Sequence, residues 1–100
     1  MHARIGTFEV SPQRLDDAVA FFRDRVAAAF SAHDGFLGYQ GYLDRERNRF
    51  VGISLWTTRS ALEASSETAR RALREAADLG AVIVGEPQVL ELAFDARSQP

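Results

Sequence analysis

The sequence predicts an α+β fold in which an antiparallel sheet carries two helices on one face. Short segments rich in β-branched and aromatic residues alternate with two longer segments whose apolar residues recur at helical spacing. A polar run, residues 44–49, separates two strand-like segments as a hairpin loop would. The order is therefore strand, helix, strand, strand, helix, strand. A single domain over 1–100, with an ordered core at about 3–94, accounts for this pattern.

The first strand is predicted over Ala3–Val10. Ser11 is expected to cap the helix that follows, with Pro12 as its first residue, because a missing N–H costs nothing at that position. We expect this helix to reach about Ser31. Phe21 lies off its apolar stripe and is interpreted as a packing residue, the alternative being a contact with a second subunit. The stripe consists of Leu15, Val19, Phe22, Val26, Ala29 and Phe30.

The middle of the chain predicts a β-hairpin. Gly35 supplies a permissive backbone after the first helix, and the second strand is expected over Phe36–Leu43. The polar loop 44–49 follows, and the third strand is expected over Phe50–Trp56. Its residues alternate between two faces. Val51, Ile53 and Leu55 point one way, and Phe50, Gly52, Ser54 and Trp56 point the other.

A second helix is predicted from the region of Thr58–Ser60 to Leu79, where Gly80 ends it. Ser60 and Glu63 fit a capping box, and Thr58 is the competing cap. One face of this helix is apolar. A short strand is expected over 81–84, a turn over 85–87, the last strand over 88–94 and a frayed tail over 96–100.

This element order is typical of a ferredoxin-like βαββαβ fold, whose sheet has helices on one face only. Neither face of the third strand is polar enough to be left in water. We therefore expect a homodimer in which the open sheet faces of two subunits pack together, burying about 800 Å² or more per subunit.

Composition excludes several classes of chemistry. The 100 residues contain no cysteine, and all 12 basic residues are arginine. Disulfides, thiolate metal sites and lysine-dependent chemistry are therefore excluded. A net charge of −2 without a basic block argues against nucleic-acid binding. No long apolar segment indicates a membrane anchor or secretory signal, so a cytoplasmic protein is expected. Two histidines without partners at ligand spacing predict no metal site.

The sequence resembles the antibiotic-biosynthesis monooxygenase-like domains of the dimeric α/β-barrel superfamily over nearly its whole length. The markers are Gly35-Phe36-x-Gly38 at the start of the second strand, Leu55-Trp56 at the end of the third, and Ala61-Leu62-x-Ala64-Ser65 in the second helix. The resemblance implies the fold firmly. It implies several alternative activities, because the superfamily includes cofactor-independent oxygenases of phenolic compounds, haem-degrading oxygenases and domains without known activity.

Family residues map onto this chain unevenly. Quinone-forming relatives carry an asparagine four residues before the tryptophan, and Gly52 stands there. The tryptophan and histidine of the haem-degrading branch fall on Ser65 and Glu75, which argues against haem. A late-helix arginine of the family matches Arg74 only if a short gap is allowed, and Arg74 lies off the apolar face. If the chain is an enzyme, the resemblance thus implies one without a cofactor, with Arg74 as a candidate for substrate binding.

Four further residues are candidates for binding a small aromatic substrate. Trp56 can form a ligand wall or plug the core, and the plug is favoured. Ser65 and Ser66 fall on the inward side of the second helix, where they can line a cavity or bond to the helix carbonyl four residues earlier. Tyr39 and Tyr42 lie on opposite faces, so only one of them can point into the cavity, and Tyr39 is carried as the candidate.

His33 is the candidate general base, because the ordinary pKa of histidine lies near neutrality; a solvent-exposed loop residue is the alternative. His2 is expected at a frayed terminus. The sequence therefore favours a cofactor-independent monooxygenase acting on a phenolic or hydroquinone-type molecule. A non-catalytic ligand-binding or accessory dimer is the alternative. A third option, an isomerase or cyclase, requires a buried ionisable group from among His33, Glu9 and Glu91.

Overall fold

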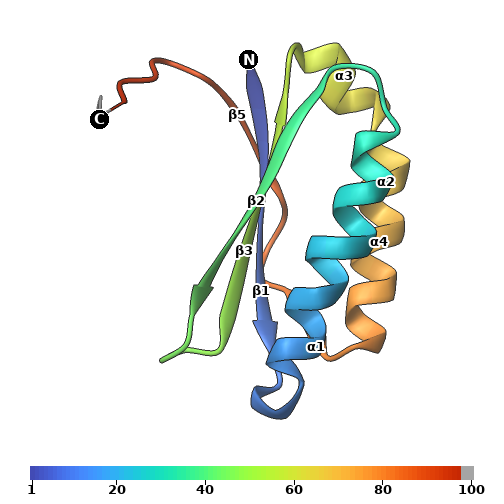
Figure 1. Cartoon of the computed structure of the whole chain (residues 1–100), viewed down its shortest axis with the longest axis vertical. Coiled ribbons are helices and arrows are strands. Elements are labelled where there is room, and N and C mark those ends of the chain that lie inside the picture. Colours follow the sequence, from blue (N-terminus) through green and yellow to red (C-terminus); the bar gives the residue numbers. More distant parts are fainter. Residues whose placement is uncertain (98–100) are drawn as a thin grey trace.

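The computed structural model describes residues 1–97, in which one antiparallel sheet packs a single face against a layer of helices (Figure 1). The strand order is β2-β3-β1-β4, and β5 also pairs with β1. This arrangement confirms the ferredoxin-like α+β fold. The strands are β1 (His2–Val10), β2 (Phe36–Asp44), β3 (Arg49–Trp56), β4 (Ala81–Ile83) and β5 (Gln88–Glu91).

The edge of the sheet beside β1 is one strand interrupted in the middle. β4 pairs with Phe8–Val10, and β5 pairs with His2–Ile5 further along the same edge. The last strand was predicted to reach Phe94, but it ends at Glu91. After one more hydrogen bond, from Leu92 N to Met1 O, the segment leaves the edge of β1 and loses the backbone partner that a strand requires. Of the predicted frayed tail, 98–100 lie outside the described residues.

The first helical stretch has the predicted extent but is not uniform. It comprises a 3₁₀ turn (Pro12–Arg14), α1 (Leu15–Ala20), a π-helical turn (Phe21–Val26) and α2 (Ala27–Ser31). The prediction that Ser11 caps it is wrong. The Ser11 side chain makes no capping bond, and its carbonyl instead accepts from Arg14 N at 2.9 Å, because the helix starts with a tight 3₁₀ turn.

The π-helical turn explains a departure from the predicted apolar stripe. Ala27 N donates to Phe22 O, five residues back, so the turn is wider than in an α-helix. As a result Phe21 and Phe22 are both buried, with ring centroids 5.4 Å apart, whereas Ala29 is exposed. Phe21 thus packs within its own subunit.

The second helix is broken, contrary to the prediction. α3 (Arg59–Ala64) and α4 (Ser66–Asp78) meet at Ser65, whose φ and ψ are −89° and 3°. In a continuous helix the carbonyl of Leu62 would accept from Ser66 N. Here it accepts from Ser65 N, Ser65 Oγ and Arg4 Nη2 instead. Competition for this carbonyl is the physical reason for the break.

Thr58, rather than Ser60, caps α3. Its Oγ1 accepts from Ala61 N at 3.0 Å, and its backbone is still extended at φ −139° and ψ 162°. The Ser60 capping box was therefore wrong, because the extended chain from β3 ends at Thr58 and Ser60 already lies inside the first turn of the helix.

Helices cover one face of the sheet and leave the other face open. One of the two alternating sets of β3 residues faces the helices and is buried: Phe50, Gly52, Ser54 and Trp56. Val51, Ile53 and Leu55 face away and are only half-buried, because no helix covers them. Residues 92–97 run off on this uncovered side (Figure 1), and Phe94 there is 81% exposed. None of the helices in residues 1–97 has the length and apolar character needed to cross a membrane.

Candidate functional site

The candidate site lies between the helix-facing side of the sheet and the helices. Strand register places Ser54 of β3 directly between Arg4 of β1 and Tyr39 of β2. In the next inward row, Gly52 lies between Gly6 and Gly41. A polar row therefore adjoins a row of glycines, where the sheet has no side chains of its own.

A cavity of about 50 Å³ opens above these two rows. Phenylalanine rings, Val26 and the small residues of α4 line most of it, so its walls are apolar. The polar members of its lining are Arg4, Tyr39 and Ser54. The remaining residues of the lining are Gly6, Phe8, Phe22, Val26, Phe30, Gly52, Ala69, Ala72, Leu73, Ile83 and Pro87.

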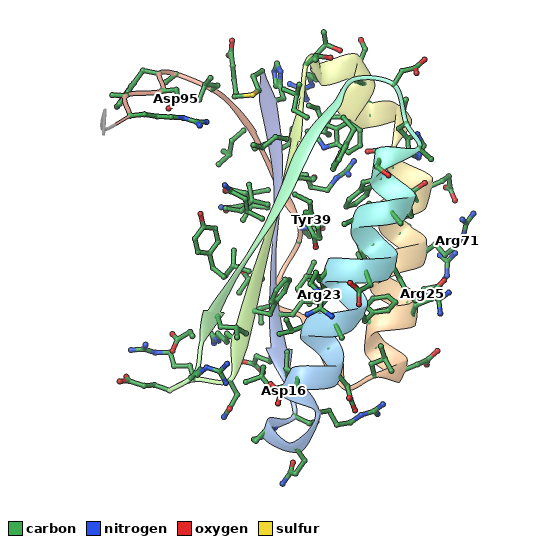
Figure 2. The ribbon with its side chains drawn as sticks, viewed as in Figure 1. Asp16, Arg23, Arg25, Tyr39, Arg71 and Asp95 are labelled. Carbon is green, nitrogen blue, oxygen red and sulfur yellow. The ribbon has the colours of Figure 1, made fainter. Side chains whose placement is uncertain are left out.

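Tyr39 occupies the space that Gly52 leaves free. A Cβ at position 52 would lie 2.5 Å from the Tyr39 hydroxyl oxygen, so any larger residue there would displace the tyrosine. Figure 2 shows the Tyr39 side chain pointing from β2 towards the helices. Its ring meets Phe30 edge-on at 5.5 Å. Burial raises the pKa of Tyr39 far above its ordinary value, so the hydroxyl stays protonated and acts as a donor.

Ser54 is 1% exposed, and its hydroxyl accepts from Trp56 Nε1 at 2.9 Å. This bond orients the oxygen and leaves the serine proton for another acceptor. Within residues 1–97 that proton has no acceptor. Ser54 is therefore a second candidate donor to a ligand in the cavity.

Among residues 1–97, Arg4 is the one cation in the cavity lining. Its Nη1 donates to Ser65 Oγ at 2.9 Å, and its Nη2 donates to Leu62 O at 2.8 Å and to Ser66 Oγ at 3.4 Å. The guanidinium carbon lies 5.9 Å from the centre of the Phe30 ring. Desolvation, and secondarily the positive charge of Arg70, lower the pKa of Arg4. An arginine remains protonated under these conditions.

Ser65 and Ser66 act on Arg4 rather than lining the cavity. Ser65 is fully buried, and its Oγ donates to Leu62 O at 2.7 Å while accepting from Arg4. The expected back-bond thus reaches three residues back rather than four. Ser66 is half-buried and makes the weaker contact. A role for either serine in ligand binding stays a prediction.

Trp56 fills the core beside the cavity. It is fully buried, and Phe30, Phe36 and His33 surround it with ring centroids at 5.6, 5.5 and 6.3 Å. Its indole contributes nothing to the cavity lining. Its contribution to the cavity is the bond that orients Ser54.

The remaining candidates lie outside the cavity. His33 Nε2 is 2.8 Å from Thr68 Oγ1 of α4, and His33 borders a separate, shallow surface hollow. Arg74 is exposed on α4, and Tyr42 points to the open face with 54% exposure. His2 lies in β1 opposite Trp56 rather than in a frayed end, and its Nδ1 is buried without a partner in the described chain.

Carboxylates contribute little to the site. Glu9 pairs with Arg49 at 3.1 Å on the surface, and Glu91 is exposed on β5, so neither is the buried group that an isomerase or cyclase would need. Over the described part of the chain, no three histidine, aspartate or glutamate residues gather in a way that could hold a metal ion.

Sequence reasoning missed Arg4 as a site residue. The signal was present, because Arg4 is in phase with Phe8 and Val10, the inward residues of an alternating strand. A charged residue at an inward position of a strand is costly unless it has partners or a function. Here it has both neutral partners and a place in the cavity lining.

A family model described as "Antibiotic biosynthesis monooxygenase" matches residues 1–77. Among curated relatives, the Mycobacterium tuberculosis proteins Rv2558 and Rv2557, both described as uncharacterized, are 36% and 33% identical over 67 residues. The matches cover 67% of this chain but only 28% and 30% of those two proteins. The matched part of the chain therefore spans less than a third of the length of these relatives.

Solved structures share the fold at low identity. SnoaB of Streptomyces nogalater, described as a cofactor-independent oxygenase, matches with a TM-score of 0.70 and 22% identity, covering 97% of both chains. The ActVA-Orf6 monooxygenase of Streptomyces coelicolor, solved with nanaomycin D, matches with a TM-score of 0.69 and 19% identity, covering 99% of this chain and 91% of that one.

Proposed function

Because the chain belongs to the antibiotic biosynthesis monooxygenase family, we propose that it is a cofactor-independent monooxygenase of a small phenolic or hydroquinone-type molecule. The observation that carries this proposal is the cavity itself. Its walls are apolar, and two hydroxyl donors and one cation converge on it, all from one row across the sheet. An oxygen-bearing aromatic ring matches such a lining in shape and polarity.

The proposed reaction needs no electron donor other than the substrate. A phenol that loses its proton becomes an electron-rich anion with carbanion character at a ring carbon. That carbon adds dioxygen by electron transfer and radical recombination, and protonation gives a hydroperoxide. Loss of water from a carbon that still bears hydrogen leaves a carbonyl group. One oxygen atom enters the product, the other leaves as water, and dioxygen accepts all four electrons from the substrate.

In this proposal the protein positions the ring and excludes water. Tyr39 and Ser54 donate to the substrate oxygens, and the rings of Phe8, Phe22 and Phe30 shield the reactive intermediate from solvent. His33 as general base stays a prediction, and its distance from the cavity lining means that a water molecule would have to relay the proton. A cytoplasmic location likewise stays a prediction.

The size of the cavity favours a substrate of one ring. Engineered cavities of about 150 Å³ hold benzene, whereas this one measures about 50 Å³. One ring can therefore enter only if a lining side chain changes rotamer. Tyr39 is the candidate for this movement, because its hydroxyl and the adjoining ring atoms fill the space above Gly52.

The test is oxygen uptake by the purified, metal-free protein with a panel of hydroquinones and phenols of one to three rings. Tyr39→Phe removes the inward hydroxyl, and Tyr42→Phe makes the same change on the open face as a matched control. We expect uptake above the spontaneous rate, reduced about tenfold or more by Tyr39→Phe and unchanged by Tyr42→Phe. His33→Gln tests the predicted base in the same assay.

A non-catalytic ligand-binding or accessory protein is the second candidate function. The observation that favours it is Gly52, which stands where quinone-forming relatives carry an amide donor. Saturable ligand binding without any oxygen uptake across the panel would establish this function instead. Equal uptake by the wild type and Tyr39→Phe would show that the cavity is not where oxygenation occurs.

We also propose that a second copy of the chain covers the open sheet face. Val51, Ile53 and Leu55 line this face together with residues of β1, and no element of the described chain covers it. Apolar sheet faces of this extent mark interaction sites. Sedimentation equilibrium is expected to give a dimer, and Ile53→Lys, which places a charge at the centre of the face, is expected to give a monomer. A monomeric wild type would contradict the proposal.

A further inference from the structure

Arg4 is half-buried and has no carboxylate partner within residues 1–97, and we infer that it is the recognition site for a ligand that is bound as an aromatic anion. The ligands that Arg4 would recognise share an aromatic ring that carries a phenolate or carboxylate oxygen. The link to oxygenation rests on the proposed function. Anion binding itself does not depend on the proposed function, because it requires only the cavity and the guanidinium.

The guanidinium is fixed in position before any ligand arrives. Ser65 Oγ and the Leu62 carbonyl bind two of its nitrogens at 2.9 and 2.8 Å, and the Phe30 ring supports its face. These contacts come from the α3–α4 junction and the first helical stretch, so three elements hold one side chain. A cation that is already ordered loses little conformational entropy when it binds a ligand.

The guanidinium also keeps unused donors. It carries five N–H groups, and its three hydrogen bonds within residues 1–97 go to Ser65, Leu62 and Ser66. Two N–H groups therefore have no protein partner in that set. Because Arg4 belongs to the cavity lining, a ligand oxygen there can accept from them.

The charge of Arg4 is not neutralised by the groups around it. All three of its hydrogen-bond acceptors are neutral, and within the described chain it forms no ion pair. On the α4 side Arg70 adds positive charge, although Glu67 pairs with Arg70. On the strands, Val89 of β5 lies opposite Arg4, Ser54 and protonated Tyr39 follow across the sheet, and His2 and Glu91 lie one row away.

The alternative is that Arg4 only caps the carbonyl of Leu62 at the end of α3. Cations commonly bind carbonyls at helix ends. Capping, however, is indifferent to the charge of a ligand in the cavity. Discrimination between a charged and a neutral ligand of the same shape therefore separates the two roles.

An anion site at Arg4 also accounts for the absence of a base among the cavity residues. Tyr39 stays protonated and His33 lies elsewhere, so no side chain of the lining can take a proton. A guanidinium next to a phenol stabilises the phenolate and lowers the pKa of the bound phenol. The proton then leaves to solvent or buffer, and the charge of Arg4 replaces a general base.

The first test compares benzoate with benzamide, which share a ring and a carbonyl but differ in charge. Calorimetric titration of the wild type is expected to detect benzoate and to give weaker binding of benzamide by about tenfold or more. Arg4→Gln is expected to abolish this preference. Arg59→Gln, which removes the same charge from an exposed arginine paired with Glu63, is the matched control and is expected to retain it.

The second test needs no variant, so it remains decisive if Arg4→Gln fails to fold. 4-Nitrophenol changes colour on ionisation, so an absorbance titration of the bound ligand gives its pKa. We expect the bound pKa to lie below that of free 4-nitrophenol by about one unit or more. The two ligands also separate the sources of the anion. Benzoate preference alone points to a carboxylate ligand, whereas a lowered nitrophenol pKa points to a phenolate.

The inference is overturned if benzamide binds as well as benzoate and the pKa of bound 4-nitrophenol is not lowered, if Arg4→Gln folds and keeps the preference, or if none of the three ligands binds. None of these readouts depends on oxygen uptake. Anion preference without uptake would therefore refute the proposed oxygenase while leaving the Arg4 site in place. Oxygen uptake without anion preference would support the oxygenase and refute the Arg4 site.

Discussion

Two rows of inward side chains, two residues apart along β3, use the same space between sheet and helices in opposite ways. The row of His2, Trp56 and Phe36 is filled, and Trp56 has no exposed surface. The row of Arg4, Ser54 and Tyr39, with the glycines beyond it, leaves a cavity. The large aromatic residue attracts attention in the sequence, but the room for a ligand arises where the residues are small.

The filled row is expected to carry the largest effect on stability. Trp56→Ala should lower the free energy of unfolding by about 3–5 kcal/mol, because it empties a fully buried site. Urea denaturation measures this loss. Arg74→Ala, at an exposed position of α4 away from the open sheet face, is the comparison and should change stability by about 0.5 kcal/mol or less. Similar losses in both variants would mean that Trp56 does not fill a tightly packed site.

The cavity row can be filled instead of emptied. Gly52→Ala places a Cβ 2.5 Å from the Tyr39 hydroxyl oxygen and should cost about 1–3 kcal/mol of stability. Because the hydroxyl causes most of the clash, the same substitution should cost less in a Tyr39→Phe background. A double-mutant cycle by urea denaturation measures this coupling. Additive costs would show that Tyr39 does not occupy the space above Gly52.

Thr58 caps α3, the helix that covers the filled row. Thr58→Ala removes the side-chain bond to Ala61 N and should lower the free energy of unfolding by about 1 kcal/mol. Ser60→Ala, at the cap that the sequence favoured, should change it by about 0.5 kcal/mol or less. Thermal unfolding of the two variants ranks them. A larger loss of stability in Ser60→Ala than in Thr58→Ala would show that Ser60 is the cap.

The smallest effect near neutral pH is expected from Tyr39, and it grows in alkali. Its pKa is raised by burial, so above pH about 10 the unfolded chain loses this proton while the folded chain keeps it. Stability should therefore fall as the pH rises through this range, and less steeply in Tyr39→Phe. Unfolding free energies measured between pH 8 and pH 11 test the sign. Parallel pH curves for the two proteins would contradict a buried phenol.

The sequence was sufficient for the order of elements, because period-two and period-3.6 patterns are local. It was insufficient wherever a distant residue intervened. The break at Ser65 depends on Arg4, which is 61 residues away and competes for the Leu62 carbonyl. The burial of Phe21 depends on the π-helical turn, which no stripe drawn at α-helical spacing can predict.

The cavity was similarly beyond the reach of local patterns. The three glycines Gly6, Gly41 and Gly52 are far apart in sequence and form one row only through the register of three strands. Of the site candidates from the sequence, Tyr39 lies in the cavity lining, and Ser65 and Ser66 contact the arginine that does. Arg4 had a local signal, its phase with Phe8 and Val10, but its place beside Ser54 and Tyr39 follows only from the register of the three strands.

The interrupted edge strand gives the protein a weak seam beside its cavity. Between the bond from Val84 N to Thr7 O and the start of β5, residues 85–87 make no pairing with β1, and Pro87 lines the cavity. Fluctuations of this short segment can therefore admit solvent without separating helices from sheet. Amide hydrogen exchange should accordingly be fast at Gly85 and Glu86 and slow along β1 and β3. Water would then reach the interior through the seam rather than by global unfolding.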